Sequence, residues 1–239
     1  MIDFGIEKIA PLCAEFGVEI TDKIKERLNL YGNLLLEWNE KINLTAITEP
    51  RNVLYKHFYD CILFFKNVDV PKNAKIADVG TGAGFPGMVL KIVRDDLQVT
   101  LIDSLNKRLV FLNDVIEKLG LTGIKTEHLR AEEAGKSKKF RESFDIATAR
   151  AVANMPVLLE YCTPLVKKNG LFVAMKGPSA REELSLCDNA LKVLGMETPQ
   201  IICETLTGEE QRMFVISKKI SQTPPKYPRK PSDISKQPL

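Results

Sequence analysis

The chain has 239 residues, of which 44% are hydrophobic and 27% charged, with 34 basic and 31 acidic side chains. This length suffices for one sizeable core with a small appendage, and the composition excludes a disordered or fibrous protein. The net charge of +3 neither indicates nor excludes a nucleic-acid partner.

Residues 1–72 are predicted to form a helical region. The stretch TDKIKERLNLYGNLLLEWNEKINL opens on Thr21, a suitable helix cap, and its apolar side chains recur every three or four positions. A second helical stretch, EPRNVLYKHFYDCILFF, follows a turn at Pro50. Within it, His57 and Asp60 are three residues apart on one helix face, where they are placed to hydrogen-bond each other.

Residues 73–219 alternate short apolar runs with helical stretches, which is typical of βαβ units in an α/β fold. The runs predicted as strands are KIADV, QVTLI, GIKTEHL, FDIATA, GLFVAMK, PQIICETL and RMFVISKK. The helices expected between them are PGMVLKIVR, NKRLVFLNDVIEKLG, MPVLLEYCTPLV and AREELSLCDNALKVLG. Only TGEEQ separates the last two strands, so we expect a mostly parallel seven-stranded sheet with an antiparallel hairpin at one edge.

Residues 220–239 are expected to form an extended or disordered tail, because they contain five prolines and no periodicity. From Lys218 to Leu239 there are six Lys or Arg against one acid, so this end carries +5 and residues 1–217 sum to −2. The tail is therefore interpreted as an arm that meets RNA phosphates, with a solubilising terminus as the alternative.

The cysteines, histidines and apolar runs limit the kinds of site and location. Five cysteines stand far apart without a C-x-x-C pair, which favours reduced thiols, and two histidines make a metal site unexpected. No run approaches the about 18 apolar residues of a membrane span, and the first residues do not resemble a signal peptide. We therefore expect a cytoplasmic protein without membrane contact or metal, and a monomer.

The loop after the first predicted strand, DVGTGAGFPG, is rich in glycine, and several ligands are conceivable. A P-loop is excluded, because Gly82 and Gly87 have its spacing but no Lys follows them. A dinucleotide site fits G-x-G-x-x-G with Asp103, which lies 21 residues past Gly82. Against it, Pro86 lacks the N–H that a pyrophosphate would need.

Asp78, two residues before the first glycine, completes D-V-G-T-G-x-G, which resembles motif I of class I S-adenosylmethionine methyltransferases. This cofactor has no phosphate, and Gly80 and Gly82 would let the backbone approach its methionine end. Asp78 would orient the loop or bind the ammonium group. Asp103 would accept the ribose hydroxyls, because a carboxylate offers only acceptor lone pairs. The alternative is a plain strand-to-helix turn with a surface Asp.

Further motifs extend the resemblance over nearly the whole chain: GTGAGFPG, DSLNKRLVFL, LRAEE, ARAVA, KYPRKP, WNEKINLTAIT and KHFYDCI. Together they resemble the bacterial small-subunit rRNA guanine-N7 methyltransferases, once called glucose-inhibited division protein B. The resemblance implies a Rossmann-like class I fold preceded by N-terminal helices, and methyl transfer from S-adenosylmethionine to N7 of a guanine. It implies 16S rRNA or the small ribosomal subunit as partner. Cys61, where Ser is common, and RKPSDI, in place of RKPGTP, depart from the family pattern.

The loop and the resemblance together give the expected site. The cofactor-binding residues would be Asp78, Gly80, Gly82, Gly84, Phe85, Asp103, Ala131, Glu132 and Arg150, and the substrate-side candidates are Pro86 and Lys176. Ala131 and Glu132 would otherwise be an acidic first helical turn, and Arg150 would otherwise form an ion pair.

Guanine N7 has a free lone pair, so no general base is expected, and Arg150 is assigned a positioning role. The [DN]-P-P-[YFW] motif of exocyclic-amine enzymes is replaced by TARAVANMP, and the chain has no Pro-Cys pair. A small-molecule methyltransferase, an NAD-dependent oxidoreductase and a non-catalytic RNA-binding protein stay open as alternatives.

Overall fold

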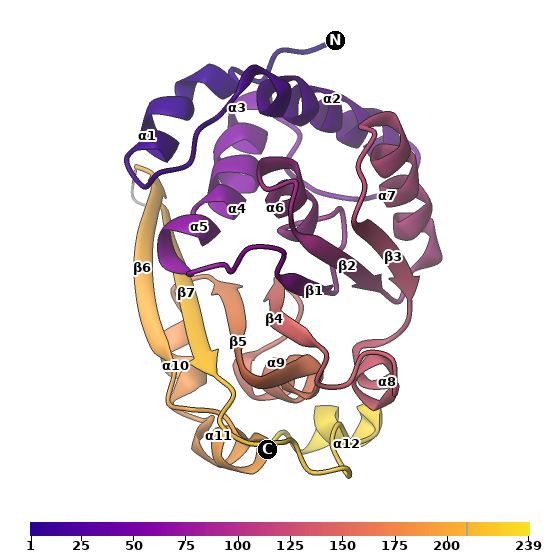
Figure 1. Cartoon of the computed structure of the whole chain (residues 1–239), viewed down its shortest axis with the longest axis vertical. Helices are drawn as coiled ribbons and strands as arrows, with labels where there is room; N and C mark the ends of the chain where they lie inside the picture. Colours follow the sequence, from indigo (N-terminus) through magenta and orange to yellow (C-terminus); the bar gives the residue numbers. More distant parts are fainter. Residues whose placement is uncertain (209) are drawn as a thin grey trace.

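The seven strands form one sheet in the order β3-β2-β1-β4-β5-β7-β6 (Figure 1). The computed structural model describes residues 1–208 and 210–239, so Glu209 in the predicted TGEEQ turn lies outside the described residues. The strands are β1 Lys75–Val79, β2 Gln98–Asp103, β3 Ile124–His128, β4 Phe144–Arg150, β5 Val166–Lys176, β6 Gln200–Thr207 and β7 Glu210–Lys218. Strands β1 to β5 pair in parallel, whereas β7 runs antiparallel to β5 and β6. The predicted mostly parallel sheet with an edge hairpin is confirmed.

Helices pack on both faces of this sheet (Figure 1). One face carries α2 Asp22–Asn39, α3 Pro50–Val53, a π-helical turn Leu54–Tyr59, α4 Asp60–Ile62, α5 Phe64–Asn67, α6 Gly87–Val93 and α7 Asn106–Lys118. The other carries α8 Ala131–Lys136, α9 Met155–Cys162, α10 Ala180–Leu184 and α11 Asp188–Leu194. The short elements are η1 Ile6–Lys8, α1 Ala10–Ala14, η3 Thr163–Leu165 and α12 Pro231–Lys236. One helix was predicted over residues 180–195, but the structure has two, α10 and α11.

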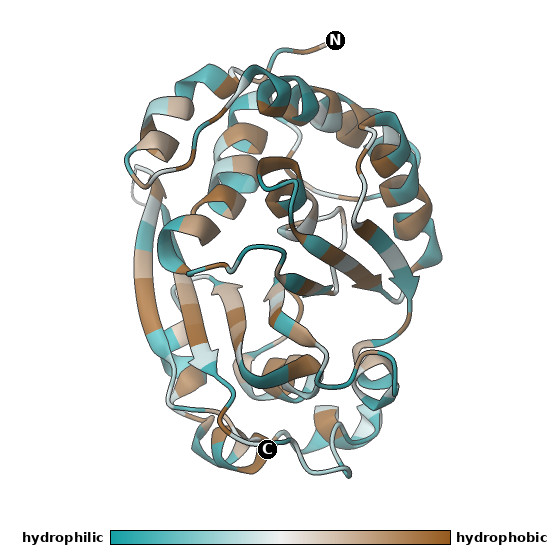
Figure 2. Cartoon of the chain, viewed as in Figure 1, coloured by the Kyte–Doolittle hydropathy of each residue, from teal (hydrophilic) through white to brown (hydrophobic). Residues whose placement is uncertain are grey.

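The N-terminal helices and the sheet share one hydrophobic core. Thr21 caps α2, since its hydroxyl accepts a hydrogen bond from Ile24 N, and the apolar stripe of this helix is buried. Tyr31 of α2 packs its ring against Phe85 and Phe111, which belong to the glycine loop and α7. Figure 2 shows apolar residues along the central strands and polar residues on the outward parts of the surrounding helices. The helical region therefore helps to support the glycine loop.

The C-terminal segment packs on the sheet domain, so the interpretation of residues 220–239 as extended or disordered is wrong. Tyr227 and Ile234 are buried among apolar side chains. The Arg141 guanidinium donates hydrogen bonds to carbonyl oxygens of four residues, Gly135, Thr223, Pro224 and Tyr227. Composition did not reveal this, because the partners of the tail lie far away in the sequence.

Two of the six cations that were expected to face RNA are occupied inside the protein. The Lys219 ammonium is buried and donates to the Thr163 carbonyl oxygen and the Thr223 hydroxyl. Arg229 binds the fully buried Glu160 carboxylate, with Nη2 donating to Oε2 at 2.6 Å. The tail thus stabilises the domain, and it is not the free arm that its charge suggested.

Candidate functional site

A cavity of about 290 Å³ opens where the carboxyl ends of β1, β2 and β4 meet. The strand order reverses between β1 and β4, which is where open α/β sheets bind ligands. The lining residues are Val79, Gly80, Ile102, Asp103, Ser104, Arg108, Leu129, Arg130, Ala131, Glu132, Ala151, Val152 and Tyr161. Four residues proposed for the cofactor, from three separate stretches of the chain, are therefore brought together here: Gly80, Asp103, Ala131 and Glu132.

The glycine loop needs its glycines for conformation and for space. Gly80, Gly82 and Gly84 have φ values of +66°, +59° and +99°, which side chains disfavour. A Cβ on Gly80 would lie 2.7 Å from Val152 Cγ2, whereas a Cβ on Gly82 would have only the Gly80 carbonyl oxygen nearby, at 3.9 Å. The backbone at Gly82 is thus open to a ligand, whereas Val152 fills the Cβ side of Gly80, which still lines the cavity.

Asp103 ends β2 and is only 3% exposed. Its Oδ1 accepts a hydrogen bond from Leu105 N at 2.8 Å, and its Oδ2 accepts one from Gly82 N at 2.9 Å. Arg108 Nη1 makes a longer third contact to Oδ2, at 3.4 Å. A carboxylate has about four acceptor positions, so one stays free for a ligand hydroxyl, and a second hydroxyl would take the position of Arg108. This arrangement fits the ribose of S-adenosylmethionine.

Asp78 lies behind the loop and does not line the cavity. Its Oδ2 accepts hydrogen bonds from Thr81 Oγ1 at 2.6 Å and from Gly87 N at 2.9 Å. The side chain is fully buried, and this burial raises its pKa to about 6. Of the two roles considered for Asp78, the structure favours the orientation of the loop.

Arg150, at the end of β4, belongs to a neighbouring polar cluster and does not line the cavity. Its Nη1 donates to the Lys56 carbonyl oxygen at 2.9 Å and to Asp60 Oδ2 at 2.7 Å, and its Nη2 donates to His57 Nδ1 at 3.1 Å. Asp60 Oδ1 also accepts from Arg212 Nε at 2.7 Å. His57 and Asp60 therefore both bind Arg150, and the prediction that His57 and Asp60 hydrogen-bond each other is wrong.

The remaining predicted residues lie around this cluster. The Phe85 ring stacks on His57 with centroids 4.3 Å apart, and the Arg150 guanidinium lies 4.8 Å from the Phe85 centroid. Phe85 and Pro86 are buried, so neither ring has an exposed face here. Lys176, at the end of β5, donates to the Ala153 carbonyl oxygen at 2.9 Å and pairs with Glu183.

Several lining residues were missed by sequence reasoning. Val152 covers Gly80, and Ala151 has a left-handed backbone with φ of +55°. Tyr161 comes from α9, far from any motif. Other missed lining residues had a signal, because they lie within quoted motifs: Ala151 and Val152 in ARAVA, Ser104 and Arg108 in DSLNKRLVFL, and Leu129 and Arg130 in LRAEE. Within the described residues, no group of three or more His, Cys, Asp or Glu is placed to hold a metal ion, and no helix is long and apolar enough to cross a membrane.

His57 gives a prediction about pH. Burial, followed by the nearby Arg150 charge, lowers the pKa of His57 from 6.5 to about 3. On acidification His57 therefore gains its proton in the unfolded chain before it does so in the folded protein. The free energy of unfolding consequently decreases as the pH falls below 6.5. Between pH 7 and 5 this loss is about 2 kcal/mol. The variant His57→Gln, which can still accept from Arg150, should lose correspondingly less stability on acidification.

The measurement is urea unfolding of both proteins at pH 5 and 7. The two proteins must be compared with each other, because the pH dependence of stability that Asp78 contributes has the opposite sign. The raised pKa of Asp78 makes stability fall as the pH rises from about 4 to 6. That contribution is common to both proteins and cancels. Equal acid sensitivity of the two proteins would contradict a neutral, buried His57.

A family profile and several similar proteins match most of the length of this chain. The profile of the family described as GidB, rRNA small subunit methyltransferase G, matches residues 24–214. A ribosomal RNA small subunit methyltransferase G from Clostridium perfringens is 50% identical over 228 residues, which cover 95% of each chain. The protein of the same description from Oceanobacillus iheyensis is 47% identical over 234 residues, which cover 98% of each chain.

Solved structures share the fold at low sequence identity. A structure of MtNAS in complex with MTA and tNA has a TM-score of 0.55 at 14% identity and covers 92% of each chain. A variant of a 16S rRNA adenine-N1 methyltransferase from Catenulisporales acidiphilia has a TM-score of 0.53 at 14% identity, covering 64% of this chain and 88% of that one. These neighbours show the class I methyltransferase fold. The family profile and the close relatives show more: this chain belongs to the family of rRNA small subunit methyltransferase G, enzymes that methylate small-subunit rRNA.

Proposed function

We propose that this enzyme transfers the methyl group of S-adenosylmethionine to N7 of a guanine in 16S rRNA. The observation that carries this proposal is the cavity at the switch point between β1 and β4, where Asp103 lies beside Gly80 and binds the open backbone of Gly82. Family membership supports the rRNA substrate.

The cavity residues would divide the work of holding the cofactor. Asp103 would accept the two ribose hydroxyls, and Gly80 and Gly82 would let the methionine end lie against the loop. Ala131 and Glu132 line the cavity on the α8 side and would border the adenine. When bound, S-adenosylmethionine supplies an electrophilic methyl group on its sulfonium.

The protein groups suit a reaction that requires no proton removal. No histidine is among the residues that line the cavity within the described chain. His57 is buried, and its pKa is lowered to about 3, so its imidazole is neutral near pH 7. Because it is bonded to Arg150, it has no free nitrogen that faces the cavity. Guanine N7 carries a free lone pair and needs no base. Alignment of reacting groups, which contributes roughly 7 to 11 kcal/mol in favourable cases, would then be the main task.

Arg150 would serve this alignment by positioning. Its guanidinium links the end of β4 to Asp60 and His57 on the N-terminal helices and lies beside Phe85 of the glycine loop. It thereby connects the N-terminal helices with the glycine loop and the end of β4, and the last two contribute Gly80 and Ala151 to the cavity lining. Lys176, at the end of the adjacent strand β5, would lie on the substrate side.

The test is methylation with radiolabelled S-adenosylmethionine, followed by nucleoside mass spectrometry of the RNA. Naked 16S rRNA and intact small ribosomal subunits are compared as substrates. We expect 7-methylguanosine in 16S rRNA from at least one of them. A label on another nucleoside would overturn the N7 assignment, and no label on either RNA would overturn the proposed reaction.

A further inference from the structure

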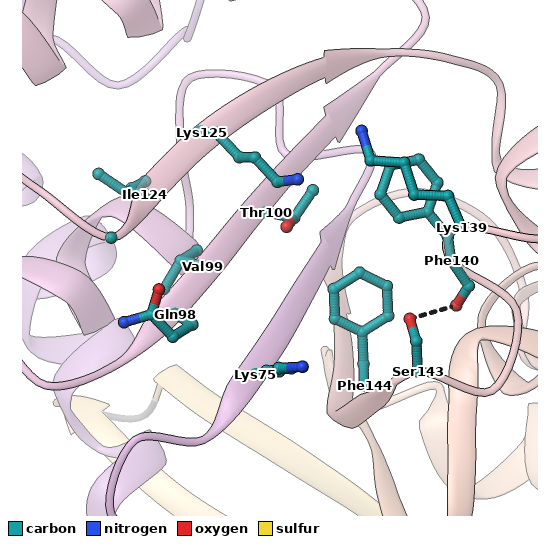
Figure 3. A pocket seen from close by; sticks show the side chains of 11 residues that line it. Lys75, Gln98, Val99, Thr100, Ile124, Lys125, Lys139, Phe140, Ser143 and Phe144 are labelled. Atoms are coloured by element: carbon teal, nitrogen blue, oxygen red, sulfur yellow. Dashed lines mark hydrogen bonds between the residues drawn. The ribbon is translucent and has the colours of Figure 1, made fainter.

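A second cavity, of about 430 Å³, is lined by residues of β1, β2 and β3 and of the segment that leads into β4 (Figure 3). It opens at the amino ends of β1, β2 and β4. Its lining residues are Lys75, Gln98, Val99, Thr100, Gly123, Ile124, Lys125, Lys139, Phe140, Ser143 and Phe144. Thr100 lines this cavity and Ile102 lines the cofactor cavity, and they are successive positions on one face of β2, roughly 7 Å apart. The two cavities therefore lie along one face of β2, the second toward its amino end and the cofactor cavity at its carboxyl end.

This basic cavity, as we call it, carries an excess of positive charge. Lys75, Lys125 and Lys139 line it, and no Asp or Glu is among its described lining residues. The nearest carboxylate, Glu127 on β3, is shared: its Oε1 lies 3.2 Å from Lys125 Nζ and 2.7 Å from Lys139 Nζ. Asp145, beside Phe144, accepts a hydrogen bond from Lys75 N at 2.7 Å and pairs with Lys167. Four ammonium groups against two carboxylates leave a net charge of +2, and the side chains of Lys125 and Lys139 are more than half exposed.

The floor of the basic cavity is aromatic. The rings of Phe140 and Phe144 are almost parallel, with centroids 6.0 Å apart. Lys139 Nζ lies 4.7 Å from the Phe140 centroid, and Lys125 Nζ lies 5.5 Å from it. Figure 3 shows Lys139 beside Phe140, with Lys75 on the Phe144 side. The two rings are only 4% and 5% exposed, so a ligand with a negative group and an apolar part would meet the lysine ammonium groups and stems, with the rings beneath them.

We propose that the basic cavity binds a nucleotide unit of the rRNA substrate, next to the nucleotide stretch that enters the cofactor cavity. The phosphate would contact the lysine ammonium groups, and the sugar or base would rest on the lysine stems and the aromatic floor. This inference relies on the rRNA substrate of the proposed function. RNA is favoured over a free nucleotide because the cavity is open, its cations are exposed, and it shares one face of β2 with the cofactor cavity.

The test variant is Lys75→Gln/Lys125→Gln/Lys139→Gln, which removes three charges and keeps side chains of moderate length over the rings. The matched control is Lys66→Gln/Lys192→Gln/Lys218→Gln, which removes the same charge elsewhere. Lys66 pairs with Glu204 on β6, and β6 and β3 are the opposite edges of the sheet, roughly 29 Å apart. Both proteins are first compared with wild type for folding by circular dichroism.

The probe is 16S rRNA transcribed in vitro, and its affinity is measured by filter binding at several salt concentrations. The slope of log affinity against log salt should fall by about 0.7 in the test variant, because the bound unit offers one phosphate and each phosphate contact on a single strand contributes about 0.7. The slope of the control should equal that of wild type. Affinity for S-adenosylmethionine, measured by calorimetry, should be the same in all three proteins.

Equal slopes in the test variant and wild type would overturn the proposal, and so would equal losses in test variant and control. Adenosine 5′-monophosphate is titrated as a second probe. If it binds in a lysine-dependent manner while the RNA slope is unchanged, the cavity serves a free nucleotide and the RNA assignment fails. Because RNA binding is measured without methyl transfer, these outcomes are independent of whether N7 is the methylated atom.

Discussion

Asp103→Ala is expected to weaken S-adenosylmethionine binding by about 10- to 150-fold. The substitution removes the carboxylate that would accept the ribose hydroxyls, and hydrogen bonds to a charged group contribute about 1.5 to 3 kcal/mol. It also frees the N–H groups of Gly82 and Leu105, which Asp103 now holds at 2.9 and 2.8 Å, so the loop keeps only its backbone hydrogen bonds to Ile102 of β2. Titration calorimetry with S-adenosylmethionine measures the effect directly.

The control for this prediction is Asp145→Ala. Asp145 also accepts a hydrogen bond from a backbone N–H, that of Lys75 at 2.7 Å, but it lies at the opposite end of the sheet, near the start of β4. Its removal should leave cofactor affinity unchanged. If the Asp103 and Asp145 variants both bind like wild type, Asp103 is not part of the cofactor site.

The sheet was predictable because its signals are local. The run KIADV coincides with β1, Lys75–Val79, and all seven predicted runs overlap a strand. A buried parallel strand needs a short apolar run, and each run is followed by a helix or a turn, so spacing alone gives the βαβ order. The division between α10 and α11 was missed, because the intervening residues 185–187 contain neither Gly nor Pro.

The tail could not be predicted from composition, because its stability depends on long-range partners. Arg229 and Glu160 are 69 residues apart in the chain, yet their side chains form a buried ion pair. Prolines and lysines suggested an exposed segment, while the two apolar residues that anchor it, Tyr227 and Ile234, are too few to form a pattern.

The candidate site also has one part that local sequence signals predict and one part that depends on long-range packing. The glycine loop and Asp103 follow consecutive strands, so their meeting at one edge follows from the fold class. The polar cluster around Arg150 depends on Asp60, which is 90 residues earlier in the chain. The sequence placed His57 and Asp60 on one helix face, but only the packing of the N-terminal helices on the sheet shows that Arg150 is their partner.

Asp60→Ala is expected to lower the free energy of unfolding by about 3 to 5 kcal/mol, because it leaves buried charges without a partner. Asp60 is fully buried, and its two oxygens accept hydrogen bonds at 2.7 Å from Arg150 and Arg212. The side chains of these arginines are 10% and 17% exposed. A guanidinium does not lose its proton in proteins, so neither charge can be neutralised after the substitution. Urea unfolding at pH 7 measures the loss.

Asp95→Ala is the matched control, because Asp95 also joins two cations, Lys23 and Arg27, at 2.9 and 2.8 Å. The Asp95 side chain is 56% exposed, and water can solvate both cations after its removal. Its loss should therefore cost less than about 1 kcal/mol. The geometry of the two carboxylates is similar, so the difference between the variants isolates burial. If Asp60→Ala is no more costly than Asp95→Ala, the carboxylate of Asp60 is solvated, and the N-terminal helices do not hold Arg150 as described.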